Sequence, residues 1–339
     1  MARANEPKGT KAAKVIAGIC LGSLVLLLAA FAGVNLFVRA TYAGFYQDAT
    51  REFAIPGTDE GFIVQDLDEL EDGTWLFSGY ATSGPSPIYA RHANGTTAKL
   101  SVTRADGTTY DGHGSGITSD GAHVFLTDDE GYLAFDLADF EQAEDGATIQ
   151  AQGRRALEFA PAFMNIENQT LFLGTFYHPG PYEAPDHHKM DTPSGDWNAA
   201  IMYAYPADAN GAFGYADQTS CAYSLPARIQ GMCITESGQL VLSQSYGLAS
   251  SHLLVYDLGP VAANEALTTE AAATFTADGA DVPLFFLDSA SLTEDITAPP
   301  MSEGIEWHEG KVWISCESAS DKYLFGKLYG ANAVYALGI

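Results

Sequence analysis

Basic residues are scarce in this chain of 339 residues, which has 16 lysines and arginines against 43 aspartates and glutamates. Four of the bases and one acid fall within residues 1–14, so residues 39–339 contain 12 basic and 42 acidic side chains, a net charge of −30. A surface that binds nucleic acid needs clustered lysine and arginine to neutralise phosphates. The composition therefore argues against nucleic acid as a partner and predicts a soluble, acidic body.

Cysteine is also rare. Cys20 lies in an apolar N-terminal run, which leaves Cys221, Cys233 and Cys316 in the rest of the chain. Three cysteines are too few for a disulfide scaffold, and an odd number leaves at least one unpaired or paired between chains. The repeat described below separates Cys233 from Cys316 by more than the ~5.5–6 Å between Cα atoms that a disulfide allows. We predict free, buried thiols.

Helical periodicity is absent after residue 38, and the single long apolar run is VIAGICLGSLVLLLAAFAGVNLFV at residues 15–38. At about 1.5 Å per residue, this run covers a hydrocarbon layer of about 30 Å. The basic flank precedes it, so the positive-inside rule places residues 1–14 in the cytoplasm and the body outside. A cleaved signal peptide is the alternative, because residues 30–32 (AFA) offer a cleavage pattern. The body is then secreted, so both interpretations export it.

A short pattern recurs five times after the apolar run, roughly 50–70 residues apart. Each copy places a turn with glycine or asparagine before an apolar run, which is typical of a strand covered on both faces. The copies are EDGTWLF (71–77), SDGAHVFL (119–126), IENQTLFL (166–173), ESGQLVL (236–242) and HEGKVWI (308–314). A further strand-like segment with an aromatic residue at its second position follows each copy: IYAR (88–91), AFDL (134–137), MYAY (202–205), VYDL (255–258) and VYAL (334–337).

A repeated four-stranded unit with covered inner strands indicates a β-propeller. The chain ends on the third strand of its fifth unit, whereas REFAIP (51–56) precedes the first unit and resembles the fourth-strand segment LEFAP (157–161). Pairing residues 51–56 with the last unit closes the ring and covers an exposed edge. A stacked sandwich would not explain why the repeat begins on a fourth strand and stops on a third.

The predicted fold class is therefore all-β, with one propeller of five four-stranded blades. Six blades remain an alternative, because residues 258–300 are long enough to contain a weak unit. The predicted domains are a cytoplasmic tail (1–14), a transmembrane anchor (15–38), a linker (39–50) and an extracellular propeller (51–339). An extended linker of this length predicts that the loop-rich face of the propeller points away from the bilayer.

In a propeller, the loops before the first strand and after the second strand of each blade share one face around the central channel. The first set predicts Gln65, His113, Ser115, Asn165, Gln230 and Glu303 at this face, and the second predicts Tyr80, Asp128, Tyr177, Gln244, Tyr246 and Glu317. From these we select a ligand-binding group: Glu303, Gln230, His113, Asn165, Gln244, Tyr246, Glu317, Tyr177 and Lys322. A Pro- and Gly-rich insertion at 177–198 is predicted to be a recognition or capping loop on the same face.

The segment SEGIEWHEGKVWIS (302–315) resembles the glutamate–glycine strand motif of gluconolactonase/regucalcin-like propellers and, more loosely, of strictosidine-synthase-like propellers. In the gluconolactonase-type enzymes, this glutamate helps to bind a divalent cation with asparagine and aspartate from other blades. The resemblance implies a metal site, such as Ca²⁺, at Glu303 and Asn165. The third ligand is missing, because Ser115 and Gln230 stand where an aspartate is needed, and those families have six blades.

Two functional hypotheses follow. The first is a non-catalytic, membrane-tethered extracellular propeller that binds a ligand or an envelope protein through its loop-rich face. The alternative is an exported, metal-dependent hydrolase, lactonase-like, with Glu303 as the principal metal ligand. Four of the few cations, Lys189, Arg228, Lys322 and Lys327, are predicted on this face. They form either a patch for an anionic ligand or pairs with the acids of the face.

Overall fold

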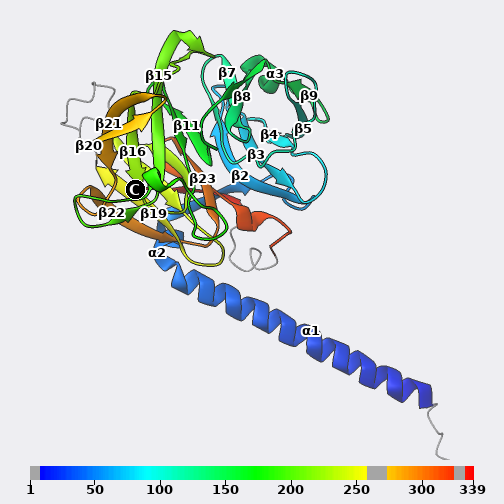
Figure 1. Cartoon of the computed structure of the whole chain (residues 1–339). Helices are drawn as coiled ribbons and strands as arrows, with labels where there is room; N and C mark the ends of the chain where they lie inside the picture. The colour runs from blue at the N-terminus through cyan, green and yellow to red at the C-terminus, as the bar shows by residue number, and fades with distance from the viewer. Residues whose placement is uncertain (1–7, 258–272, 324–332) are drawn as a thin grey trace, which may run out of the picture.

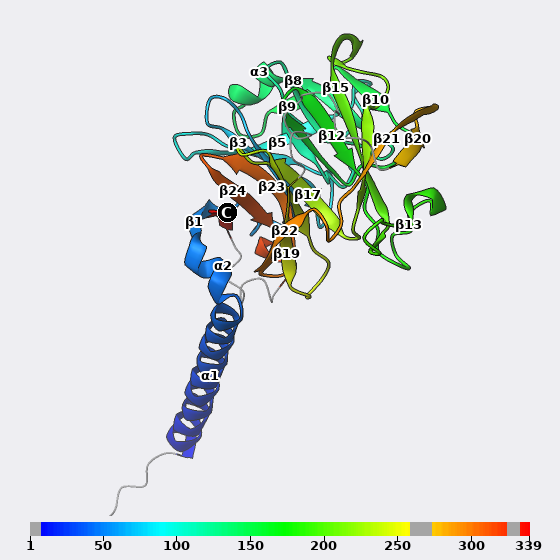
Figure 2. The same ribbon diagram turned by 90° about the vertical axis from the view of Figure 1, so that its left-hand side faces the viewer.

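The computed structural model describes residues 8–257, 273–323 and 333–339 (Figures 1 and 2). A long N-terminal helix, α1 (Lys8–Thr41), projects from a ring of β-sheets, and a short helix, α2 (Ala43–Asp48), joins the two. The sheets are the blades of a five-bladed propeller. The predicted fold class is confirmed.

The first two blades follow the expected order from the channel outwards. Blade 1 contains β2 (Phe62–Glu69), β3 (Trp75–Ala81), β4 (Ile88–Arg91) and β5 (Thr97–Thr103), with β9 (Thr148–Gln150) parallel to β5 at its edge. Blade 2 contains β6 (Ile117–Ser119), β7 (His123–Thr127), β8 (Gly131–Asp136) and β10 (Gly153–Ala156). The helix α3 (Leu137–Glu141) follows β8.

Blades 3 and 4 account for the segment that allowed a sixth blade. Blade 3 contains β11 (Phe163–Glu167), β12 (Thr170–Gly174), β15 (Ala200–Ala212) and β16 (Cys221–Leu225), and β21 (Ala280–Phe286) and β20 (Ala273–Ala277) extend its edge. Blade 4 contains β17 (Ile229–Ile234), β18 (Gln239–Gln244), β19 (Ser251–Asp257) and β22 (Leu292–Ala298). Residues 273–298 thus complete two existing blades, and residues 258–272 lie outside the described chain.

The predicted ring closure is confirmed in blade 5. This blade contains β23 (Ser302–His308), β24 (Lys311–Cys316), β25 (Ala333–Leu337) and β1 (Ala49–Ala54). The first strand of the chain pairs antiparallel with the last, from Ala49 opposite Leu337 to Ala54 opposite Ala333. β1 and β25, which would each leave an unpaired edge, therefore pair with each other.

Packing between inner strands explains why the glutamate–glycine motif has a glycine. A Cβ atom on Gly304 would lie 1.6 Å from Asp66 Oδ1 on the neighbouring inner strand β2. A larger residue would therefore push β23 away from β2 at the channel. The motif therefore marks a close approach of two inner strands.

The linker differs from the expectation. Instead of an extended tether, residues 43–48 form α2, and the side chains of Val38, Tyr42 and Phe45 are buried against blades 4 and 5. Tyr42 Oη lies 3.1 Å from the Oγ of Ser250, which belongs to the β18–β19 loop on the loop-rich face. The apolar side chains of this segment dock on the propeller because they would otherwise be exposed to water.

The helix α1 consequently meets the propeller on the side of the loop-rich face, and α2 returns the chain to the opposite face, where β1 begins (Figures 1 and 2). The predicted orientation of the loop-rich face, away from the bilayer, rested on an extended linker, and the docked residues 43–48 do not form one. Within α1, Lys11–Thr41 contains an 18-residue window with a mean hydropathy of 2.6, and it is long and apolar enough to cross a membrane. A signal sequence would have the same properties.

All four cysteines are free thiols, and Cys221, Cys233 and Cys316 are buried. Burial raises the pKa of Cys221 to about 11 and that of Cys316 to about 12, so the reactive thiolate form is depleted. We expect these three thiols to resist alkylation in the folded protein and to react fully in denaturant. Mass spectrometry of the non-reduced, alkylated protein measures this, and a peptide pair that links Cys233 to Cys316 would contradict it.

Candidate ligand site

A cavity of about 930 Å³ opens on the loop-rich face at the mouth of the central channel. All five blades contribute to its wall, for example through Tyr80, His113, Phe176, Tyr246 and Glu317. The insertion between β12 and β15, which contains η1 (Asp186–His188), β13 (Met190–Asp191) and β14 (Trp197–Asn198), forms one side of it. The predicted capping position of this insertion agrees with the structure.

Three β-bulges direct polar side chains into the cavity. The pairing register shifts between Val64 and Asp66 in β2, and between Ile229 and Gly231 in β17. A third shift lies in β23, between Ser302 and Ile305. A bulge inserts an extra residue into a strand and changes the direction of its side chain. The extra residues include Gln65, Gln230 and Glu303, which all line the cavity.

Glu303 has the most unusual environment of the three. It is only 3% exposed, and its carboxyl group makes no hydrogen bond within the described chain. Burial, followed by the nearby charges of Glu317 and Asp66, raises the pKa of Glu303 well above its ordinary value. Because Glu303 lines the cavity, its carboxyl faces the space that a ligand would occupy. The carboxyl group of Glu303 can therefore accept a proton, or a hydrogen bond from a donor group of a ligand.

A hydrogen-bond network surrounds Glu317 at the cavity wall. Tyr80 and Tyr323 both donate to Glu317 Oε1, with O···O distances of 3.2 Å and 2.6 Å. The ammonium of Lys322 donates in turn to Tyr80 Oη at 2.6 Å. In the described part of the chain, Glu317 thus has two hydrogen-bond partners, whereas the Glu303 carboxyl has none.

His113 extends the same wall. Its ring stacks on Tyr80 with centroids 4.5 Å apart, and its Nε2 lies 2.7 Å from Gln65 Oε1. Burial, and then the charge of Lys322, lowers the pKa of His113. The neutral ring donates its Nε2 proton to Gln65, and this bond fixes the orientation of both side chains.

Aromatic rings form the opposite part of the lining. Tyr182 and Phe176 from the insertion contact Tyr246 from the β18–β19 loop, with centroid distances of 5.4–6.4 Å among the three rings. Tyr182 is 53% exposed, so this cluster presents ring surface to solvent. The faces of such rings bind apolar groups and cations.

The charge of the lining is negative. It includes five carboxylates and one ammonium among the described residues: Glu130, Glu158, Glu183, Glu303, Glu317 and Lys322. Of the other predicted cations, Lys189 pairs with Glu183 and Asp186 at 3.1 and 3.3 Å, and Lys327 lies outside the described chain. The site therefore favours a cation over an anion.

The nine side chains selected from the sequence divide into two groups. Six line the cavity: Glu303, Gln230, His113, Tyr246, Glu317 and Lys322. The remaining three, Asn165, Gln244 and Tyr177, do not contribute to its lining. The structure thus brings six of the nine side chains together at the cavity, and the other three make contacts elsewhere.

Each of the three diverted side chains has a partner elsewhere. Gln244 donates from Nε2 to the carbonyl of Ala227 at 2.8 Å, and the Tyr177 ring is buried under the insertion, where it contacts Trp197. Asn165 lies in the channel beneath the cavity. Its Nδ2 donates to the carbonyl of Met232 and to Glu306, so it engages a different glutamate from the one expected.

Asn165 thus bonds to Glu306 and not to Glu303, its expected partner in the metal pair. In the parts of the chain that the structure describes, no three His, Cys, Asp or Glu side chains come together in an arrangement that could hold a metal ion. Calcium requires six to eight oxygen ligands. The structure therefore gives no support to a calcium site at Glu303.

Sequence reasoning missed a group of acids on the inner strands. Asp66 and Asp68 on β2 are buried, and Glu167 on β11 and Glu306 on β23 are partly buried in the channel. Burial is the main cause of a raised pKa in each of them. The sequence does show these acids within predicted inner strands, for example Asp66 and Asp68 in FIVQDLDE of blade 1.

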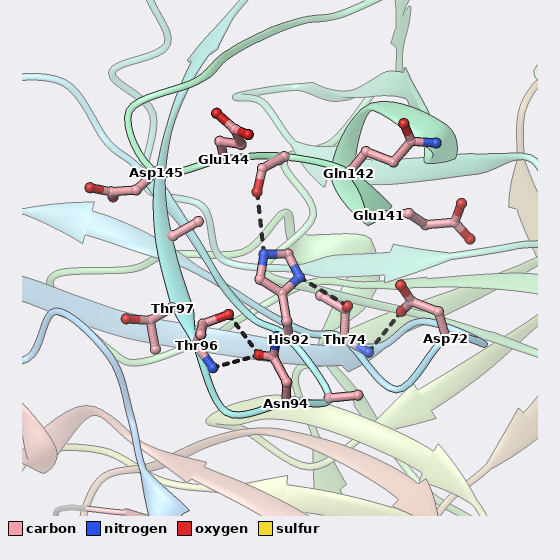
Figure 3. Close-up of a pocket in the computed structure, with 13 residues that line it drawn as sticks. Asp72, Thr74, His92, Asn94, Thr96, Thr97, Glu141, Gln142, Glu144 and Asp145 are labelled. Carbon is pink, nitrogen blue, oxygen red and sulfur yellow. Dashed lines mark hydrogen bonds between the residues drawn. The ribbon is translucent and has the colours of Figure 1, made fainter.

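A second, open pocket of about 600 Å³ lies on the opposite face of the ring (Figure 3). His92 at its centre bonds to Thr74 Oγ1 through Nδ1 and to the Ala143 carbonyl through Nε2. Asn94 accepts two bonds from Thr96 in the adjacent turn. Because these polar groups satisfy one another, the pocket is a weaker candidate than the channel-mouth cavity.

Neither a protein-family model nor a curated protein sequence matches the chain. Several solved structures are similar to this chain. A glutaminyl cyclase from Myxococcus xanthus is 11% identical, with 79% of this chain and 91% of that chain covered at a TM-score of 0.40. A PQQ-bound aldose sugar dehydrogenase from Streptomyces coelicolor is 12% identical, with 79% and 78% covered at a TM-score of 0.38. The WD40 β-propeller domain of Doa1 is 8% identical, with 85% and 96% covered at 0.39. Similarity at this level carries no argument about activity.

Proposed function

We propose that this protein is a membrane-tethered propeller outside the cytoplasm that binds a small organic cation in the channel-mouth cavity. The observation that carries the proposal is Glu303, a buried carboxyl group that lines the cavity and has no hydrogen-bond partner among the described residues. A ligand ammonium group would donate hydrogen bonds to the Glu303 carboxyl and would place a positive charge next to it.

The rest of the lining fits such a ligand. Four further carboxylates make the potential of the cavity negative, which attracts cations from solution. The rings of Phe176, Tyr182 and Tyr246 provide a surface for the apolar part of the ligand. A polar group that fixes orientation in a partly apolar concave site is the usual design of a small-molecule site.

Two probes of similar shape and opposite charge test the proposal. We expect 2-phenylethylamine to bind, as measured by calorimetry and by a rise in melting temperature, and 3-phenylpropionate not to bind. Glu303→Gln should weaken amine binding by about 10–100-fold, because a hydrogen bond to a charged group contributes about 1.5–3 kcal/mol. The matched control, Glu236→Gln, alters an exposed acid on the opposite face and should bind as the wild type.

The pH dependence gives a further check. Because the pKa of Glu303 is raised, its carboxyl is protonated at mildly acidic pH and ionised only at higher pH. Amine affinity should therefore increase as the pH rises through that pKa, and the increase should be absent in Glu303→Gln.

Three results would contradict the proposal: preference for the anion, equal affinity for both probes, or unchanged binding in Glu303→Gln. Retention of one equivalent of calcium after dialysis, with its loss in the same variant, would favour the metal-dependent hydrolase instead.

A further inference from the structure

We infer that the loop-rich face rests against the bilayer that α1 crosses, so that the cavity opens toward the lipid–water interface. The occupant of this surface is the membrane itself. The inference concerns the placement of the propeller and does not depend on the chemistry of the ligand.

The first supporting observation is the fixed connection between α1 and the propeller. Val38 is 3%, Tyr42 is 8% and Phe45 is 2% exposed, and all three belong to one hydrophobic cluster with the strands of blades 4 and 5. The rings of Phe45 and Tyr46 contact Tyr335 of β25 at centroid distances of 5.7 and 6.0 Å. We refer to residues 38–48 as the elbow. A buried elbow does not let the propeller rotate freely about the end of the helix.

The second observation is the side on which the elbow attaches. Tyr42 contacts Ser250 in the loop that also carries Tyr246, a cavity residue. The last turn of α1 therefore ends beside the loop-rich face. In Figures 1 and 2, α1 leaves the propeller on the side of these loops and away from α3 on the opposite face.

The third observation is independent of the helix. Outside α1, the exposed large hydrophobic side chains of the described chain are Tyr182, Trp197, Leu248 and Ile339. The first three, which are 53%, 49% and 56% exposed, lie in the insertion and in the β18–β19 loop on the loop-rich face. Exposed tyrosine, tryptophan and leucine side chains are typical of surfaces that enter the headgroup region of a bilayer.

The net charge of the propeller determines which forces can hold it against the bilayer. The body carries a net charge of −30 and contains few cations, so attraction to anionic lipids does not hold it on the surface. Contact depends on α1 and on the three exposed side chains. We therefore expect it to persist in vesicles of zwitterionic lipid and at high salt concentration. A ligand that partitions into the interface would reach the cavity from the bilayer side.

The test uses the full-length chain in nanodiscs of phosphatidylcholine, with retention of α1 verified by intact mass. Cys20→Ser removes the exposed thiol, and the buried thiols are left in place. Single cysteines introduced as Leu248→Cys or Asp72→Cys are labelled with an environment-sensitive fluorophore. Lipids with a spin label near the headgroup then report proximity by quenching. Position 72 is the control, in the β2–β3 turn on the opposite face.

We expect at least twofold stronger quenching at position 248 than at position 72, with a blue-shifted emission only at 248. Replacing the elbow residues in Tyr42→Ala/Phe45→Ala should reduce this difference, and the melting temperature shows whether that variant is folded. Equal quenching at both positions, stronger quenching at position 72, or loss of α1 by cleavage in the cell would overturn the inference. Either quenching result would leave amine binding and the membrane tether intact, so the two proposals fail separately there. Loss of α1 by cleavage would overturn this inference and the tether, but not amine binding.

Discussion

A propeller fragment that begins at residue 58 should melt far below one that begins at residue 49, or should aggregate during expression. The two differ by residues 49–57, which contain the buried Ile55 and β1, the strand that closes the ring by pairing with β25 over five register positions. Its loss would leave a long unpaired edge on blade 5 and would expose apolar surface. Each lost backbone hydrogen bond costs about 0.5–1.5 kcal/mol, before any loss of side-chain packing.

Phe53 contributes much of that packing. Its ring contacts Trp75 and Trp313 at centroid distances of 6.0 Å each, and the Arg91 guanidinium lies 4.0 Å above it. Phe53→Ala, which keeps the strand and removes the ring, should lower the free energy of unfolding by about 3 kcal/mol.

Calorimetry and denaturant titration measure these effects. An ectodomain that begins at residue 38 and therefore keeps the elbow controls for the loss of α2. Equal melting temperatures for the fragments that start at 49 and 58 would show that β1 does not close the ring.

The folded protein should be more stable at pH 5 than at pH 8. Burial raises the pKa of Asp68 to about 7 and that of Glu167 to about 7, and it also raises the pKa values of Asp66 and Glu306. In the unfolded chain, such carboxyls titrate near pH 4. Between these values, the folded state binds more protons than the unfolded state.

The sign of the effect follows from that difference. The stabilisation is fully present below about pH 4 and is lost as the pH rises through about 7, because the folded state must then bury charged carboxylates. A difference of one pKa unit is worth about 1.4 kcal/mol, so we expect the free energy of unfolding to fall by about 3–5 kcal/mol from pH 5 to pH 8.

Asp68→Asn provides the sharpest variant. Ser119 Oγ lies 2.6 Å from Asp68 Oδ2, a contact that an asparagine amide can keep without a charge. The variant should be more stable than the wild type at pH 8 and should lose part of the pH dependence. Glu144→Gln, at an exposed position, should follow the wild type. A free energy of unfolding that rises from pH 5 to pH 8 in urea titrations would contradict the prediction.

The sequence predicted five blades and the closure of the ring, because both predictions rest on local patterns. Each hairpin turn and apolar run indicates a strand that is covered on both faces, and five copies favour five blades. The alternative of a sixth blade at residues 258–300 was decided by the tertiary structure, in which β20, β21 and β22 join blades 3 and 4. The resemblance between residues 51–56 and a fourth strand can likewise be recognised from the sequence alone. Strand order then places Gln230, Glu303 and Glu317 on one face, since the ends of successive strands alternate between the two faces.

Only the tertiary structure decided which of these side chains enter the cavity. Gln65, Gln230 and Glu303 point inward because bulges change the local register, and a bulge depends on the partner strand as much as on its own residues. Asn165 instead bonds to Glu306 in the channel, a contact that joins two blades far apart in the sequence. The elbow could not be predicted for the same reason. Whether residues 38–48 extend or dock depends on apolar surface that blades 4 and 5 present only after the ring has closed.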